Sequence, residues 1–396
     1  MNNVDLAAFF LYFCGAKHVF SIDMNLRMRY FIALMLAFLV FSAVGAKTIR
    51  LGIILPLHDD NGDGRRMIEY YRGVLMACDS LKKTGLSVDV HAWNTPEDSD
   101  VKEVLRDPAA AQCDLIIGPL YSRQVRALSD FIEEHDIKLL IPFSITAPAL
   151  YTNRNIFQVY QNPNDFNTHN ISAFLSQFQD YHPVIVDCND TTSKKGIFTF
   201  GLRRKLEERG VDYNVTNLKS SEAAFYKAFS TEHPNVVVLN TGRHQELGVA
   251  LAKLNGIRAA HPDLNICLYG YTEWLGYTRL YLEQFYRYNT YVPAAFYTNL
   301  SSADTQRLQQ KYRWNFHQDM QQMLPRFALT GFDHTMFFIK GLDRMGKDFN
   351  GEVGQLTITP VQTPLRFERI GNGGLRNRTL MLVHYLPEQR VELINK

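Results

Sequence analysis

The sequence contains none of the short motifs that mark common enzymes and metal sites. It has no GxSxG nucleophile elbow, no HExxH zinc pair and no GxGxxG loop. Its twelve histidines are scattered, and no two of its five cysteines have the spacing of a zinc site. The glycine cluster at 371–374 lacks the lysine and hydroxyl of a P-loop and instead predicts a hairpin turn. We therefore expect no catalytic residues, no metal site and no cofactor.

Net charge and cysteine are also scarce. The formal net charge is +2, with 42 basic and 40 acidic residues, which gives no reason to expect nucleic acid or an anionic membrane as a partner. Four cysteines follow the N-terminal leader described next: Cys78, Cys113, Cys188 and Cys267. An oxidising compartment permits disulfides, but a chain of this size does not need them. Four buried thiols and any of three pairings remain open from the sequence.

Long hydrophobic runs occur only in the first 46 residues. Arg27 and Arg29 precede an apolar run at 30–41, and Val44-Gly45-Ala46 follows as a small-residue cleavage site, which is the pattern of a secretory signal peptide. The run is shorter than the roughly 20 residues of a bilayer span. A second apolar stretch at 6–14 suggests that translation starts at Met24 or Met28 and that residues 1–23 are not translated. We predict a periplasmic protein, exported and soluble after cleavage of residues 1–46.

The remaining chain is organised around residues 111–148. Leu115-Ile116-Ile117 is an apolar run that Gly118-Pro119 ends, as in a strand buried within a parallel sheet. Apolar residues at 125, 128 and 132 then predict an amphipathic helix with Ser122 as its N-cap. A second apolar run, 138–141, ends at Pro142. This stretch predicts a βαβ unit.

The two strands of this unit point the same way, so the loops that follow them leave the same edge of the sheet. In open α/β sheets, ligands bind at that edge. The candidate binding residues there are Tyr121, Ser122, Ser144, Ile145 and Thr146. Hydroxyls and free backbone N–H groups at a helix N-terminus suit a small carboxylate. The alternative is that these residues only form the turn and the cap of the unit.

Alternating strand and helix patterns continue to about residue 350, and residues 352–396 become strand-like. The fold class predicted is α/β, with two doubly wound, Rossmann-like lobes joined by a multi-strand hinge. The first lobe is predicted at 47–160 and 298–350, and the second at 161–297 and 351–396.

The segments DLIIGPLYS, IPFSITAPAL, LGIILPL, EYYRGVLMACDSLKKTG and FALTGFDHTMFFIKGLDRMG resemble those of type I periplasmic solute-binding proteins. This is the class of the leucine/isoleucine/valine-binding protein of ABC transporters. The resemblance covers most of residues 48–396 and implies the type I periplasmic binding protein fold. It also implies that a carboxylate in the loop after Gly270 holds the ammonium group of an amino acid, which suggests Glu273, one residue from the expected position. Tyr271 and Trp274 would line an apolar pocket beside it, although such aromatic residues also occur in ordinary packing.

The prediction is thus a receptor, not an enzyme, that closes two lobes on a small polar ligand, an amino acid or a related compound, for uptake through an ABC permease. The alternative is a cell-envelope regulatory protein that uses the same fold without transport and binds another envelope protein.

Overall fold

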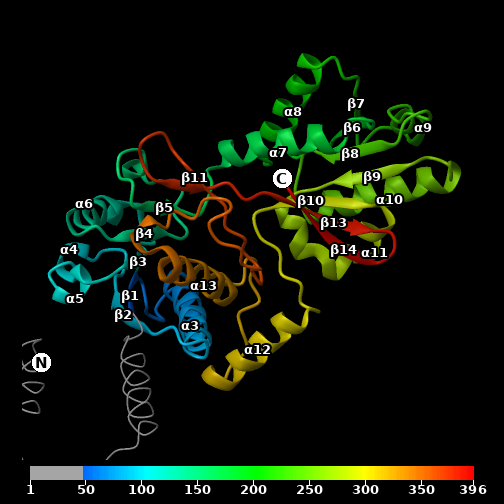
Figure 1. Ribbon diagram of the computed structural model, residues 1–396. Coiled ribbons are helices and arrows are strands. Elements are labelled where there is room, and N and C mark those ends of the chain that lie inside the picture. The colour runs from blue at the N-terminus through cyan, green and yellow to red at the C-terminus, as the bar shows by residue number, and fades with distance from the viewer. Residues whose placement is uncertain (1–47) are drawn as a thin grey trace, which may run out of the picture. The chain divides into compact units, whose positions relative to one another are not determined.

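The computed structural model describes residues 48–396 (Figure 1). The predicted leader, 1–46, and the question of the start codon lie outside the described residues. Within residues 48–396, no helix is both long enough and apolar enough to cross a bilayer.

The first lobe contains a seven-stranded sheet with the order β11-β12-β5-β4-β3-β1-β2. All strands except β11 run parallel to their neighbours. The residues of β1, β3 and β4 are almost all buried because helices cover both faces of the sheet. The elements of this lobe are β1 (Ile49–Leu55), α3 (Gly62–Lys82), β2 (Val88–Asn94), α4 (Val101–Val104), α5 (Pro108–Ala111), β3 (Leu115–Ile117), α6 (Val125–His135), β4 (Lys138–Ile141), β5 (Ile156–Gln158), α12 (Ala303–Phe316), α13 (Phe327–Met345), β11 (Phe367–Arg369) and β12 (Leu375–Asn377).

The second lobe contains another seven-stranded sheet with the order β14-β13-β10-β9-β8-β6-β7. Strands β7, β6, β8, β9 and β10 are parallel, and β13 and β14 are antiparallel additions at one edge. One aromatic-rich core fills this lobe. Its elements are α7 (Pro163–Gln177), β6 (His182–Asp187), α8 (Gly196–Glu208), β7 (Asn214–Asn217), α9 (Glu222–Tyr226), β8 (Asn235–Leu239), α10 (His244–Ala260), β9 (Ile266–Tyr269), α11 (Thr278–Arg287), β10 (Thr290–Ala294), β13 (Met381–Leu386) and β14 (Arg390–Asn395).

The chain passes between the two sheets in three crossing segments. They are 159–162 between β5 and α7, 295–302 between β10 and α12, and 378–380 between β12 and β13. The side-chain amide of Gln161, in the first crossing, donates to the carbonyl oxygen of Thr379 in the third at 2.9 Å. This is the α/β fold with two doubly wound sheets and a multi-strand hinge that the sequence predicts.

The predicted assignment of 351–396 to the second lobe differs from the structure. Strand β12 pairs with β5 of the first sheet, and β11 pairs with β12 across the hairpin that the glycine cluster predicts. Gly373 and Gly374 bring the hairpin against residues 150–156, and a Cβ at Gly373 would lie 2.3 Å from the carbonyl oxygen of Leu150. The hairpin therefore joins the first lobe, and only 381–396 returns to the second.

The apolar periodicity of the sequence predicts helices that begin at Met67 and at His169, and both begin earlier in the structure. Helix α3 starts at Gly62, because the side chain of Asn61 caps it by accepting from Gly64 N–H. Helix α7 starts at Pro163, with Asn162 as the cap. Both are ordinary N-cap signals, Asn before Gly or Pro, outside the apolar pattern.

All four cysteines of the described residues are free. Burial raises the pKa of Cys78, Cys113 and Cys188 to about 12, and that of Cys267 further. The structure thus has the unpaired thiols, one of the alternatives that the sequence leaves open.

Candidate functional site

The predicted βαβ unit forms the centre of the first lobe's ligand edge. Strands β3 and β4 are parallel neighbours, so the loops after Ile117 and Ile141 leave side by side. Gly118 has a φ of +136°, and a Cβ there would lie 2.1 Å from the carbonyl oxygen of Ile54. Only glycine fits this turn.

Ser122 does not cap α6 as predicted. It begins a short 3₁₀ turn, Ser122–Gln124, and α6 starts after it at Val125 without a side-chain cap from the described residues. The Oγ of Ser122 instead lies 2.7 Å from the Oγ of Ser144, in the loop after β4. The structure therefore brings the two predicted hydroxyls together, and they form a hydrogen bond with each other.

The hydroxyl of Ser144 is already fully engaged. It donates to the carbonyl oxygen of Thr146 at 3.1 Å and accepts from the N–H of Thr146 at 3.3 Å and from Ser122. One donor and two acceptor positions are all that a hydroxyl has. With Ser144 only 7% exposed, its hydroxyl closes the loop and has no position left for a ligand.

The other candidates of this edge are more accessible. Ile145 is 49% exposed, and Thr146 is exposed beside it. Tyr121 is half-buried, and its hydroxyl lies 3.5 Å from a carboxylate oxygen of Asp63. Partial burial and the nearby carboxylate raise the pKa of Tyr121. These three side chains could contact a solute at the surface of the first lobe.

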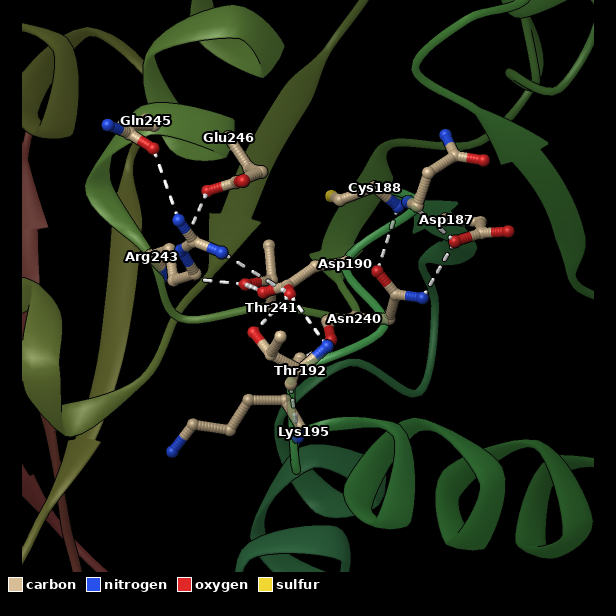
Figure 2. Close-up of polar contacts among 12 residues, drawn as sticks. Asp187, Cys188, Asp190, Thr192, Lys195, Asn240, Thr241, Arg243, Gln245 and Glu246 are labelled. Carbon is tan, nitrogen blue, oxygen red and sulfur yellow. Dashed lines mark hydrogen bonds and ion pairs between the residues drawn. The ribbon is translucent and has the colours of Figure 1, made fainter.

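In the second lobe, the loops after β6 and β8 are held together by a polar network around Asp190 (Figure 2). The buried Asp190 carboxylate accepts from Thr192, through its N–H at 3.0 Å and its hydroxyl at 2.6 Å, and from the hydroxyl of Thr241 at 2.8 Å. These hydrogen bonds, with the charge of Arg243 nearby, lower the pKa of Asp190 to about 2. The carboxylate is therefore ionised and fixed at neutral pH.

Asn240 completes the network. Its side chain donates to the Asp187 carboxylate at 2.9 Å and accepts from the N–H of Cys188 at 2.8 Å. The hydroxyl of Ser193 donates to the carbonyl oxygen of Asn240 at 2.8 Å. The loop that leads to Lys195 and to the N-terminus of α8 is therefore rigidly placed (Figure 2).

Glu273 lies in the predicted loop, but a group of the protein already pairs with it. The Lys195 ammonium nitrogen lies 2.6 Å from a Glu273 carboxylate oxygen and 4.9 Å from the ring centroid of Tyr271. The side chains of Lys195 and Glu273 are 31% and 47% exposed, so the pair faces solvent. The position that the ammonium group of an amino acid was expected to take is filled by Lys195.

Tyr271 and Trp274 are core residues in the structure. Tyr271 is 4% exposed and donates its hydroxyl proton to the carbonyl oxygen of Leu239. Trp274 is fully buried and stacks on Phe285, with ring centroids 5.8 Å apart. Both side chains belong to the aromatic core of the second lobe, and neither is among the residues that line the cavity described below.

A cavity of about 640 Å³ lies where the crossing segments meet the second lobe. Most of its wall is apolar. The first crossing contributes residues 159–161, the second contributes 295 and 296, and the first lobe adds Pro325 and Thr330. The charged side chains of its lining are Lys194, Lys195 and Glu273.

Comparisons with known proteins agree with this architecture. No protein-family model and no curated protein matches the chain. Among solved structures, a protein described as a branched-chain amino acid ABC transporter from Rhodospirillum rubrum aligns with a TM-score of 0.58 at 15% identity, over 88% of this chain and all of that one. A branched-chain amino acid ABC transporter periplasmic ligand-binding protein from Burkholderia xenovorans aligns with a TM-score of 0.50 at 12% identity, over 87% and 94%.

LpoA from Haemophilus influenzae also aligns, with a TM-score of 0.54 at 14% identity, over 89% of this chain and 59% of that one. At these identities the alignments show a shared fold. This is the type I periplasmic binding protein fold.

Within the type I fold, sequence reasoning missed most of the cavity lining. Lys194 and Lys195 end the polar loop after β6, and their place after a parallel strand was the signal that could have found them. Asn164 and Asn167 lie on the first turns of α7, where no strand exit marks them. They line the cavity together with Ile197 and Phe198 of α8, the helix against which α7 packs.

Proposed function

We propose that this protein is an exported receptor that binds a small solute between the lobes of its type I fold. The observation that carries the proposal is the cavity of about 640 Å³ at the crossing segments, to which both lobes contribute side chains. A solute that contacts both lobes stabilises their closed arrangement more than their open one, and this difference drives closure. Such a receptor would carry its solute through the periplasm and deliver it to an ABC-type permease.

The cavity has the character of a ligand site. Its size lies within the usual range of about 300–1,000 Å³ for small-molecule sites, and its wall is mainly apolar with a few polar groups. The polar network around Asp190 holds loops together, and the hydroxyl of Ser193 extends it to the cavity by accepting from the backbone N–H of Lys195. The proposal gives this network a structural role and invokes no catalysis.

The test is thermal unfolding of the purified protein against amino acids, short-chain acids, sugars and short peptides. A ligand at about a hundred times its dissociation constant stabilises a protein by about 2.7 kcal/mol, which raises the midpoint by several degrees. We expect one chemical class to shift the midpoint. The outcome against the proposal is a panel in which no compound shifts it and no small molecule co-purifies.

A second candidate is a cell-envelope regulatory protein that binds another protein and transports nothing. The engagement of Ser144 and Glu273 by groups of the protein itself favours it, because the predicted amino-acid contacts are filled. Under this proposal the same unfolding panel gives no shift, and a protein partner is sought by crosslinking in the envelope.

A further inference from the structure

We propose that the ligand of this cavity is an apolar monocarboxylate, a branched or aromatic acid without an α-ammonium group, bound through Lys195 and Lys194. This inference rests on the proposed solute-binding function and names its ligand class. It departs from the amino acid that the sequence predicts.

The charged side chains of the cavity lining favour an anionic ligand. Lys195 and Glu273 form an ion pair 2.6 Å apart, so their charges compensate each other. Lys194 also lines the cavity, is exposed, and has no ion-pair partner within residues 48–396. The lining therefore has a net charge of +1, which favours an anion and disfavours a second cation.

The geometry of the Lys195–Glu273 ion pair disfavours a ligand ammonium group and permits a ligand carboxylate. An α-ammonium group that bound Glu273 would have to replace the ammonium group of Lys195, which lies 2.6 Å from Glu273 and 4.9 Å from the ring centroid of Tyr271. The backbone N–H of Lys195 donates to Ser193, whose hydroxyl donates to the carbonyl oxygen of Asn240, so the loop that carries Lys195 is held in place. Lys195 has three N–H donors, and one carboxylate uses only part of them. It can therefore donate to Glu273 and to a ligand carboxylate at the same time.

Neutral donors also line this cavity. Asn164 and Asn167 are three residues apart on α7, line the cavity, and their side-chain amides have no hydrogen-bond partner within residues 48–396. The hydroxyl of Tyr160 is likewise unpaired within that range, and Tyr160 lines the same cavity. Amide and hydroxyl donors in the same cavity as two lysines suit the two oxygens of a carboxylate.

The rest of the cavity wall determines the chemical character of the part of the ligand that lies away from the carboxylate. Aromatic and aliphatic side chains dominate it: Val159, Phe166, Ile197, Phe198, Phe296 and Leu324. A hydrocarbon or phenyl group gains free energy by leaving water against such a surface, whereas a sugar or a second charge does not. A carboxylate at one end and an apolar body at the other match the cavity.

The experiment is calorimetric titration of the purified protein with two matched pairs of probes. 4-Methylpentanoate is compared with leucine, and 3-phenylpropanoate with phenylalanine, because each pair differs only by the α-ammonium group. We expect at least one acid to bind about tenfold or more tightly than its amino acid, with an affinity that falls as salt is added.

Two variants separate the roles of the ion pair. Lys195→Gln should weaken acid binding by about tenfold or more, whereas Lys219→Gln, at an exposed lysine outside the cavity, should leave it unchanged. Glu273→Gln frees Lys195 from its partner and should strengthen acid binding several-fold. If Glu273 instead held a ligand ammonium, the same change would abolish amino-acid binding.

The outcomes also separate this inference from the proposed function. Tighter binding of leucine or phenylalanine than of the matched acids, or binding only of sugars or peptides in the unfolding panel, overturns the monocarboxylate and leaves the receptor in place. Binding of no probe and no panel compound overturns both.

Discussion

Gly270 lies against the indole ring of Trp274, which explains why the loop after β9 begins with glycine. A Cβ at position 270 would lie 2.3 Å from Cε3 of Trp274, whose ring is fixed by stacking on Phe285. Gly270→Ala should therefore lower the free energy of unfolding by about 1–3 kcal/mol through overpacking. Urea denaturation measures it. Gly62→Ala, where a Cβ meets nothing within 4 Å, is the control, and equal midpoints for the two variants would contradict the packing argument.

His334 makes the stability of the first lobe depend on pH. Burial lowers its pKa to about 3, while the Tyr70 hydroxyl lies 2.9 Å from its Nδ1. The folded pKa lies below the unfolded value of about 6.5, so the stability from neutral His334 is complete above about pH 6.5 and is lost as pH falls towards 3. Between about pH 7 and pH 5, the wild-type protein should lose about 2 kcal/mol more than His334→Gln.

The comparison isolates His334 from its neighbour Asp333. Burial raises the pKa of Asp333 to about 6, so its contribution increases as pH falls through that range, opposite to that of His334, and is common to both proteins. His233→Gln, at an exposed histidine, should keep the wild-type slope. Denaturation series at several pH values give the dependence of stability on pH. Equal slopes for wild type and His334→Gln would show that His334 does not cause this dependence.

At the scale of single residues, the sequence located the loops better than the roles within them. Tyr121, Ser122, Ser144, Ile145, Thr146 and Glu273 all lie in loops at the ends of parallel strands, as predicted. Which of their polar atoms are already paired depends on partners distant in the chain, such as Lys195 for Glu273 and Ser122 for Ser144. No local pattern encodes those pairings.

Among the elements, α13 anchors a neighbouring segment through one carboxylate. Asp333 accepts from the N–H groups of Val361, Gln362 and Thr363, at 2.8, 2.8 and 2.7 Å. The buried Gln362 in turn accepts from the hydroxyl of Thr298 in the second crossing at 2.7 Å. Helix α13 therefore fixes the second crossing through residues 361–363.

Asp333→Asn should loosen this connection. The amide presents an N–H to a backbone N–H, so a buried donor loses its acceptor, at a cost of about 1–3 kcal/mol. Hydrogen exchange should become faster at 361–363 and at Tyr297, whose N–H donates to the Gln362 carbonyl. Asp343→Asn, at an exposed position of the same helix, is the control. Unchanged exchange at 361–363 would show that other contacts hold the segment.

The segment FALTGFDHTMFFIKGLDRMG, which contains α13, supported the prediction of the fold, and the packing of this helix explains why its residue pattern is specific. A Cβ at Gly331 would lie 2.1 Å from the carbonyl oxygen of Tyr70, and one at Gly73 of α3 would lie 1.9 Å from that of Ala328. Helices α3 and α13 thus touch through their backbones, and Asp333 and His334 add the contacts described above. By contrast, the short strands β11 and β12 carry too few residues for a periodic signal, so the sequence placed them in the wrong lobe.

For the whole molecule, the sequence predicted two lobes because each repeats the same alternation of strands and helices. It did not predict how they are tied across the first crossing. The buried guanidinium of Arg376 in β12 donates to Gln158 of β5 at 3.1 Å and to Asp165 of α7, and thus joins the first sheet to the second lobe. Such a tie connects residues more than 200 positions apart and has no local signature.

Closure on a ligand should be visible in the size of the whole molecule. With a saturating probe that binds, the radius of gyration from small-angle X-ray scattering should fall, because the lobes approach each other. At a probe concentration near the wild-type dissociation constant, Lys195→Gln should show a clearly smaller decrease than the wild-type protein. An unchanged radius at saturation would mean that binding does not close the lobes.

The low reactivity of the four unpaired thiols allows introduced cysteines to be labelled selectively. With pKa values near 12, less than about one in a thousand of Cys78, Cys113 and Cys188 is thiolate near pH 8, and Cys267 is less ionised still. A cysteine introduced at the exposed Glu103 and another at the exposed Lys227 would react with maleimide dyes while the native thiols stay silent. Residues 48–396 could thus be labelled, without removal of any of these four cysteines, as a single-molecule fluorescence sensor of solute binding.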